Sequence, residues 1–278
     1  MEKIIILCFF LLQGLLSNAQ SVADYTIYYD FTFITDTANH TFSSPEEFML
    51  LRIGKESRFA ASARYYNDST RAVFSELYPE PDFKSQEDMQ KYANLFLEKV
   101  TPKPVRSDFK IIKNFETGNF ISIRMHSMVP MQYLEEPMAL AWEMTNESDT
   151  IQGLPCMKAT TKYGGRNYNA WFTLAVPIND GPYVFQGLPG LILKVTDDKG
   201  WYNFTVKDII TTKTNKVILQ DWIYENSQRI DRKTFVDKLT SYKHNPTMPP
   251  GVMNYPEERL LEKKKAYEKR FDLLLEQY

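Results

Sequence analysis

Apolar and polar residues alternate with a period of two between residues 24 and 36. The odd positions from Tyr25 to Phe33 are aromatic or isoleucine, and the even positions are mostly Asp and Thr. This pattern is typical of a long, half-buried β-strand. Further extended segments are predicted at about 48–53 and 58–66, where aromatic and small residues predominate.

The spacing then becomes helical, and two helices are predicted. The clearer one begins at Ser85, with Asp88 three residues later as a capping partner, and it ends before Pro102. Its apolar residues share one face: Met89, Tyr92, Ala93, Phe96, Leu97 and Val100. We expect this face to cover the protein's own sheet, because that use of an apolar stripe is more common than filling a partner's groove.

A period of two returns after the helices. Strands are predicted at 121–126, where Pro130 should stop the strand, and at 140–144, before a stretch of turn-forming residues at 146–149. A hairpin is predicted from two strands at about 191–196 and 202–209, joined by Asp, Lys and Gly residues. The central part of the chain is therefore predicted to be mainly antiparallel β-sheet.

The strongest hairpin signal is Gly164-Gly165, because two glycines accept the positive φ angles of a primed two-residue turn. Pairing outward from this turn places Ala159 opposite Ala170 and gives one apolar face. On the other face Lys158 lies opposite Trp171, which predicts a cation–π contact.

The C-terminal part is predicted to be helical. A helix is expected at 232–242, followed by a proline-rich connection from residue 246 and a charged helix at 257–278. The apolar stripe of that last helix comprises Leu260, Tyr267, Phe271, Leu274 and Tyr278. We expect it to pack on the same domain.

The first 19 residues have the features of a secretory signal peptide. Lys3 precedes an apolar run from Ile4 to Leu16, and the small-residue site Ser17-Asn18-Ala19 follows. The run is shorter than the roughly 20 residues that span a bilayer. An uncleaved anchor is the alternative. We expect export to the periplasm or outer membrane, or secretion.

The predicted organisation is a signal peptide at 1–19, a β-rich domain at 20–245, and the connection with its helix at 246–278. The fold class is α+β, with a strongly curved antiparallel sheet, a bowl or half-barrel, and packed helices. With 14% aromatic residues the chain has large side chains for a core. A net charge of −2 argues against nucleic acid as the main partner, and no membrane span is expected in the mature chain.

The most distinctive motif is a hexapeptide just before the predicted strand at 191–196. It consists of Gly187, Leu188, Pro189, Gly190, Leu191 and Ile192. We interpret it as a type II turn in which Pro189 presets φ, Gly190 supplies φ > 0, and Gly187 permits close backbone approach. The alternative is the rim of a binding cavity. A phosphate loop is excluded because Leu-Ile-Leu, and not a helix, follows the glycines.

The hexapeptide occurs with Ala170-Trp171-Phe172-Thr173, the turn Asp180-Gly181-Pro182, and a single Cys156 just before Lys158-Ala159-Thr160. This combination resembles the GLPGLI family of exported Bacteroidota proteins. Most members have no assigned activity, and the resemblance implies an outer-membrane transporter as a partner. A fainter likeness in fold to LolA-type lipoprotein carriers implies a concave apolar face.

The sequence contains few signs of catalysis. It has three histidines, no G-x-S-x-G or H-E-x-x-H motif and no pair of spaced cysteines, so serine hydrolase, zincin and zinc-ribbon classes lack support. Met125, His126, Met128 and Met131 invite comparison with Cu(I) sites. Strand alternation would separate them, so we interpret the methionines as core residues and expect no metal or cofactor.

We therefore expect a non-catalytic envelope protein that binds an apolar or peptide ligand or assists a transporter. The alternative is an enzyme using Asp or Glu residues in the concave cavity. Cys156 is by default buried and inert, and a reactive thiol beside Lys158 is the minority interpretation. Thr37, Ser69 and Thr150 lie in Asp-Ser/Thr tripeptides that resemble O-glycosylation acceptors, near predicted turns.

Cleavage after Ala19 is directly testable. Because small residues precede that position, the mature protein should begin at Gln20. N-terminal peptide mass spectrometry of protein from the envelope checks this, and an intact Met1 end would establish the uncleaved anchor instead.

Overall fold

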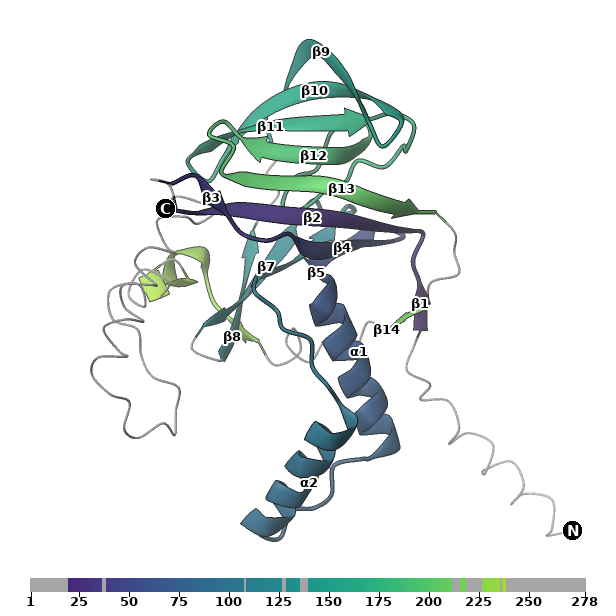
Figure 1. Cartoon of the computed structure of the whole chain (residues 1–278), viewed down its shortest axis with the longest axis vertical. Helices are drawn as coiled ribbons and strands as arrows, with labels where there is room; N and C mark the ends of the chain where they lie inside the picture. Colours follow the sequence, from purple (N-terminus) through teal and green to yellow (C-terminus); the bar gives the residue numbers. More distant parts are fainter. Residues whose placement is uncertain are drawn as a thin grey trace, which may run out of the picture.

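The computed structural model describes residues 20–36, 39–107, 109–126, 129–135, 140–211, 216–218, 227–235 and 237–238. The elements are β1 (Gln20–Val22), β2 (Tyr25–Asp36), β3 (Thr41–Phe42), β4 (Glu46–Ile53), β5 (Glu56–Ala61), α1 (Ser62–Leu77), α2 (Gln86–Lys99), β6 (Phe109–Asn114), β7 (Phe120–His126), β8 (Val129–Glu135), β9 (Glu143–Ile151), β10 (Leu154–Tyr163), β11 (Arg166–Thr173), β12 (Leu191–Asp197), β13 (Tyr202–Ile210), β14 (Lys216–Ile218) and β15 (Gln228–Arg229). Figure 1 shows a broad sheet from which the helices extend.

One open sheet of thirteen strands dominates the fold. Its order is β15-β8-β7-β6-β5-β4-β2-β13-β12-β11-β10-β9, with β3 beside β2. Every pair is antiparallel except β15 with β8, so the predicted mainly antiparallel sheet is confirmed. The early meander from β4 to β8 and the late meander from β9 to β12 meet through the pairing of β2 with β13.

The predicted alternation holds in the middle of β2. Ile27, Tyr29 and Phe31 are buried while the residues between them are half-buried. Thr26 is also buried, because it pairs with Leu51 on the opposite face, which is covered as well. β2 therefore lies between two apolar layers.

The two faces of the sheet differ in what covers them. The outer face of β4 and β5 carries a small cluster of Ala23, Leu51, Ala60 and Tyr65, the last from α1. The inner face carries the main core, which includes aromatic side chains from both meanders. Phe48 stacks on Phe59 and Phe109 with ring centroids 4.9 and 5.0 Å apart.

The helices correct two expectations. The extended segment predicted at 58–66 ends at Ala61, where α1 begins and brings Tyr65 onto the sheet. The cap of α2 is confirmed, since the Ser85 side chain accepts a bond from the Asp88 backbone N–H at 3.1 Å. The expected packing of α2 is wrong.

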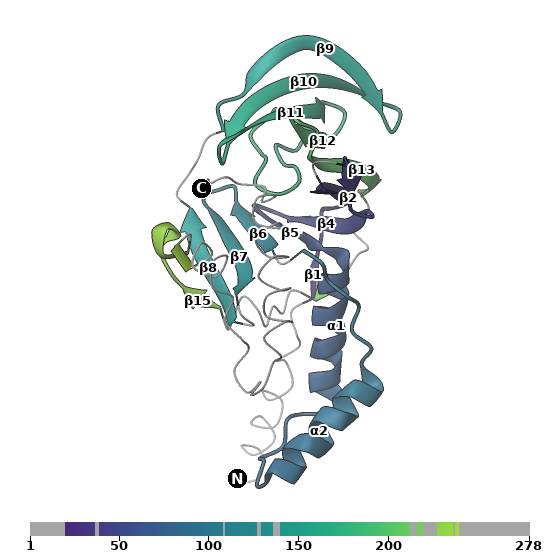
Figure 2. The ribbon, with the colours of Figure 1, turned by 60° about the vertical axis from the view of Figure 1, so that its left-hand side comes forward.

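The apolar stripe of α2 contacts α1 and not the sheet. Phe74 of α1 lies 5.5 Å from Tyr92 and 5.1 Å from Phe96, measured between ring centroids. No residue of α2 is fully buried. Figures 1 and 2 show the helix pair extending away from the sheet.

Both predicted hairpins are confirmed. Gly164 and Gly165 have φ values of 51° and 75°, and the pairing of Ala159 with Ala170 matches the predicted register. The Lys158 ammonium lies 5.8 Å from the centre of the Trp171 ring, as predicted.

Two turn predictions are wrong. Residues 146–149 belong to β9, because pairing with β10 overrides their turn propensity. The strand predicted at 121–126 is confirmed as β7, but Pro130 does not serve as its stop, because Pro130 lies inside β8 opposite Met125.

Several predicted segments lie outside the described residues. These are the signal peptide at 1–19, the connection and helix at 246–278, and residues 236 and 239–242 of the helix predicted at 232–242. The described residues of that helix, 232–235 and 237–238, are helical. In the described part of the chain, no helix has the length and apolarity needed to cross a membrane.

Candidate functional site

The connection between β11 and β12, residues 174–190, lies against the inner face of the sheet, and we call it the inner loop. Its side chains Tyr183, Val184, Phe185 and Leu188 are buried. Figure 2 shows it running beneath the arching strands β9 and β10. The loop occupies the face on which the carrier likeness would place an apolar ligand.

Aromatic contacts join the inner loop to both meanders. The Tyr183 ring lies 5.2 Å from Phe109 of β6 and 6.4 Å from Phe204 of β13. The Phe185 ring lies 4.7 Å from Tyr168 of β11. Tyr183 has φ of 53°, a rare conformation for a non-glycine residue that the surrounding packing must maintain.

A buried ion pair ties the inner loop to β6. The Lys113 ammonium donates to Asp180 Oδ1 at 2.7 Å, to the Gly181 carbonyl at 2.6 Å and to the Phe185 carbonyl at 3.3 Å. All three donors of the ammonium are thus used, and both charged side chains are 0% exposed. Burial lowers the pKa of Lys113, and Asp180 opposes that shift.

A second cation completes the surroundings of Asp180. Arg52 Nη1 lies 3.7 Å from Asp180 Oδ2, and the guanidinium stacks 3.7 Å from the centre of the Phe115 ring. The Tyr29 hydroxyl donates to the Ile192 carbonyl at 2.7 Å, and burial with nearby Asp180 raises its pKa well above the usual range. The carboxylate is enclosed by protein.

A second inner carboxylate also has a structural partner. Asp197 Oδ2 lies 3.3 Å from Arg166 Nη1, while Asp197 Oδ1 accepts the backbone N–H groups of Trp201 and Tyr202 at 2.6 and 3.0 Å. Asp197 closes the turn between β12 and β13. Both Asp180 and Asp197 are buried and are held by partners within the protein.

The hexapeptide is a chain corner, but its glycines exchange the predicted roles. Gly187 has φ of +94°, whereas Gly190 is not in the positive-φ region. A Cβ atom at Gly190 would lie 2.0 Å from the Thr173 carbonyl oxygen, so Gly190 serves close backbone approach. The prediction of φ > 0 at Gly190 is wrong, because tertiary contact with β11 makes glycine necessary there.

The other predicted residues are dispersed. Cys156 is buried, its thiol donates to the Leu154 carbonyl at 3.3 Å, and burial raises its pKa, which favours the inert interpretation. The Lys158 ammonium pairs with Glu147 at 2.8 Å. Ser69 lies in α1 and not in a turn, and Thr150 is exposed near the end of β9.

Two further predictions fall wholly or partly outside the described residues. Thr37 and Met128 are among the residues not described, as are the side chains of Met125, His126 and Met131. Within the described residues, no group of three or more His, Cys, Asp and Glu side chains could hold a metal ion.

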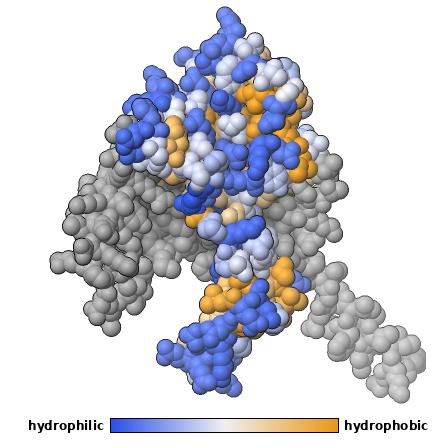
Figure 3. Space-filling view, in the orientation of Figure 1, coloured by the Kyte–Doolittle hydropathy of each residue, from blue (hydrophilic) through white to orange (hydrophobic). Residues whose placement is uncertain are grey.

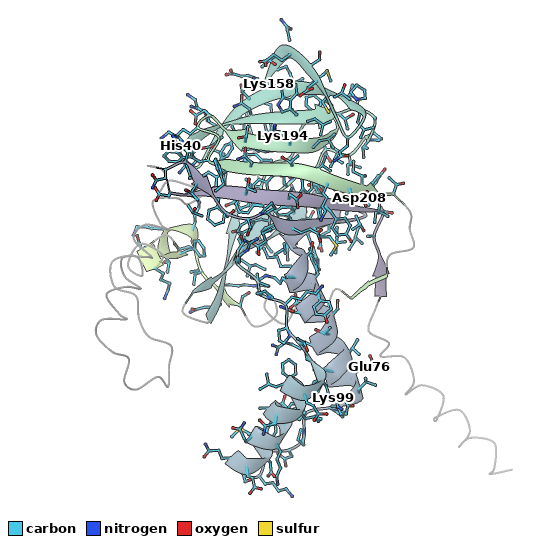
Figure 4. The ribbon with its side chains drawn as sticks, in the orientation of Figure 1. His40, Glu76, Lys99, Lys158, Lys194 and Asp208 are labelled. Atoms are coloured by element: carbon cyan, nitrogen blue, oxygen red, sulfur yellow. The ribbon has the colours of Figure 1, made fainter. Side chains whose placement is uncertain are left out.

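An open apolar groove runs along α1, and we call it the α1 groove. It encloses about 410 Å³ and is lined by Tyr66, Ser69, Thr70, Val73, Phe74, Leu77, Tyr78, Lys99 and Val100. Figure 3 shows hydrophobic colouring over the lower part of α1. Figure 4 places Lys99 at the end of α2 beside α1.

Sequence reasoning missed both the ion pair and the groove. A lysine directly after the apolar pair Ile111-Ile112 is the one signal for Lys113. No comparable signal marks the groove, because it depends on how α1 and α2 pack.

Replacing Gly190 separates the two explanations of the motif. Gly190→Ala should cost at least about 3 kcal/mol of unfolding free energy, and Gly190→Asn no less, because any Cβ meets the Thr173 carbonyl. At Gly153, where φ is +75° and space is open, Asn should be better tolerated than Ala. Urea denaturation measures the unfolding free energy of all four variants. If Gly190→Asn were clearly more stable than Gly190→Ala, a positive φ at Gly190 would explain the glycine instead.

Removing Lys113 tests the ion pair. Lys113→Met should cost about 3–5 kcal/mol, because it leaves a buried carboxylate without its nearest cation. Adding Asp180→Asn should recover part of that loss. The exposed pair of Lys55 with Glu116, at 2.7 Å, provides the control, and Lys55→Met should change stability by less than about 1 kcal/mol. Equal effects of the two single substitutions would contradict a structural role for the pair.

The chain was compared with known proteins in sequence and in structure. No curated protein matches the chain in sequence. Among solved structures, PNGF-II in space group P21 is similar with a TM-score of 0.50 and 14% identity, over 77% of this chain and 32% of that chain. A C2 crystal form of PNGF-II matches at 0.47 and 12% identity, with the same coverage.

The likeness to PNGF-II shows the fold alone, and this chain spans about a third of the length of that protein. Residues 164–194, from the β10–β11 turn through the hexapeptide, match the family described as "Protein of unknown function (Porph_ging)". This match confirms the resemblance to the GLPGLI-type family that the hexapeptide and its neighbours indicate.

Proposed function

We propose that this chain is an exported, non-catalytic accessory protein of the cell envelope whose α1 groove binds an amphipathic helix of a partner protein. The observation that carries the proposal is the exposure of the groove's large apolar side chains. Tyr66, Val73 and Leu77 are 39%, 45% and 67% exposed. Such side chains in a row mark an interaction site more often than an ordinary surface.

The geometry of the groove suits a helix. Its volume falls within the range of ligand sites. Tyr66, Thr70, Val73 and Leu77 follow one another at four, three and four residues, the spacing with which one helix meets another. Recognition of an amphipathic helix through anchors at this spacing is a common way of binding a peptide.

The sheet supports this proposal because it carries the helices and, in the described part of the chain, leaves no open concave face for a ligand. We infer a strongly curved sheet whose concave face is filled by the inner loop, so that the binding surface lies on the helices. Asp180 and Asp197 are both engaged in buried pairs, which favours a binding protein over an enzyme using these carboxylates. The occurrence of this fold within a longer chain, PNGF-II, is compatible with an accessory module.

The partner that fits best is another envelope protein. The family resemblance implies an outer-membrane transporter, and such a protein could present an amphipathic segment to the groove. At the groove, the Lys99 side chain lines one wall and the Lys103 ammonium lies 4.2 Å from the centre of the Tyr66 ring. Acidic side chains on the rim of the partner helix would complement these cations.

Photocrosslinking in the native envelope tests the proposal. A benzophenone amino acid replaces Val73, and mass spectrometry identifies the attached peptide. We expect a segment of another protein with apolar residues at alternating spacings of three and four. A synthetic copy should bind the Val73→Glu/Leu77→Glu variant at least about thirtyfold more weakly than the unchanged chain, as for loss of a binding hot spot of 2 kcal/mol.

Met89 supplies the matched control. It is an exposed apolar residue of α2, 51% exposed, and is not among the residues that line the groove. Met89→Glu should leave binding of the synthetic peptide unchanged. Recovery of lipid alone at Val73, or equal weakening by the Met89 and groove variants, would contradict the proposed function.

A further inference from the structure

One wall of the α1 groove is the segment that follows α2. Lys99 is the last residue of α2, and Val100 after it is extended, with φ of −116° and ψ of 122°. Pro102 and Pro104 then fix two more φ angles and confine the residues before them to extended conformations. The wall is therefore stiff, and its two lysines, Lys99 and Lys103, lie at a set separation.

Asn67 of α1 holds this wall at Lys103. The Asn67 side-chain amide donates to the Lys103 carbonyl at 2.9 Å, and its side-chain oxygen accepts the Lys103 backbone N–H at 2.8 Å. One side chain thus satisfies both polar groups of one backbone residue. These bonds keep the Lys103 backbone against α1, and its ammonium lies 4.2 Å from the centre of the Tyr66 ring.

Both lysines are accessible to a partner. The Lys99 side chain is 44% exposed and pairs with Glu98 at 2.8 Å. Lys103 is also exposed. An exposed pair of this kind contributes little free energy, so a carboxylate of a partner can replace Glu98 at small cost. The groove therefore combines a mainly apolar floor on α1 with two cations along one side.

The separation of the two cations sets a spacing for the charges of a bound helix. The extended chain from Lys99 to Lys103 covers about 12 Å, at 3.1 Å per residue. On an α-helix, residues seven apart share one face and are about 10.5 Å apart, at 1.5 Å per residue. The flexible lysine side chains span the small difference. Residues four apart cover only about 6 Å and fit one lysine at a time.

We propose that the α1 groove selects a partner helix with two acidic residues, seven positions apart, beside its apolar stripe, and that Lys99 and Lys103 bind these carboxylates. This inference rests on the proposed function, because it names the chemistry of the helix that occupies the same groove. Asn67 is a positioning residue, since it holds Lys103 in place. The apolar floor supplies affinity, and the two cations discriminate between helices.

Synthetic amphipathic helices of about 20 residues, roughly 30 Å long, test this inference. All carry leucines at alternating spacings of four and three and differ only at two positions beside this stripe. These positions, seven apart, hold glutamate, glutamine or lysine, and a fourth peptide has its two glutamates four apart. The seven-spaced glutamate peptide should bind about tenfold more tightly than the glutamine peptide, as for two exposed ion pairs. The four-spaced glutamate peptide should bind more weakly than the seven-spaced one. Fluorescence anisotropy measures each Kd.

Two variants with the same change in net charge provide a matched control. In Lys99→Glu/Lys103→Glu the preference should reverse, so that the lysine peptide binds about tenfold more tightly than the glutamate peptide. In Lys84→Glu/Lys91→Glu, where both side chains are exposed and neither lines the groove, the glutamate peptide should still bind most tightly. Asn67→Ala should bind the glutamine peptide as the unchanged chain does and lose most of the preference for glutamate.

The outcomes separate this inference from the proposed function. Equal binding of the glutamate, glutamine and lysine peptides would overturn the inference, and so would a preference that Lys99→Glu/Lys103→Glu leaves unaltered. Equal binding of the two glutamate peptides would overturn the spacing, and an unchanged preference in Asn67→Ala would overturn the positioning role. All these results leave the apolar groove, and with it the proposed function, standing.

Failure of every peptide to bind would also overturn the inference, while crosslinking from Val73 decides the proposed function separately. The variant Val73→Glu/Leu77→Glu should weaken binding of all four peptides, because it alters the apolar floor and leaves both lysines in place. Unweakened binding by that variant would show that the peptides bind elsewhere, which would overturn the proposed function and this inference together.

Discussion

The ion pair between Lys113 and Asp180 holds the inner loop on the sheet. Burial of two charges costs several kcal/mol per ion unless geometry and hydrogen bonds compensate. Here one ammonium satisfies three oxygens of the loop, and Arg52 approaches the other oxygen of Asp180. Apolar packing tolerates small shifts, whereas this arrangement of donors and acceptors fits one position of the loop. The pair therefore fixes where Tyr183 and Phe185 enter the core.

This constraint decides what covers the inner face of the sheet. Once fixed, the inner loop fills the inner face and links β6 with β11 and β13 through aromatic contacts. In a LolA-type carrier this inner face would be open to an apolar ligand. Here the side chains of the inner loop occupy it. Exposed apolar side chains also occur on the helix pair, where Val73 and Leu77 are 45% and 67% exposed.

The sequence by itself determined the features that depend on neighbouring residues. The glycine pair at 164–165 accepts the angles of one turn type, and that turn sets the register of β10 with β11, including Lys158 opposite Trp171. Ser85 and Asp88 define the start of α2 within one turn of helix. The hexapeptide identified the family resemblance.

Only the tertiary structure decided the features that depend on distant residues. Lys113 and Asp180 are far apart in the chain, and no local pattern pairs them. Gly190 is required by the Thr173 carbonyl, and residues 146–149 extend because β10 pairs with them. The stripe of α2 was visible in the sequence, but its partner was not, because apolar attraction is non-directional and does not specify which surface it covers. Packing made that choice, and with it the groove.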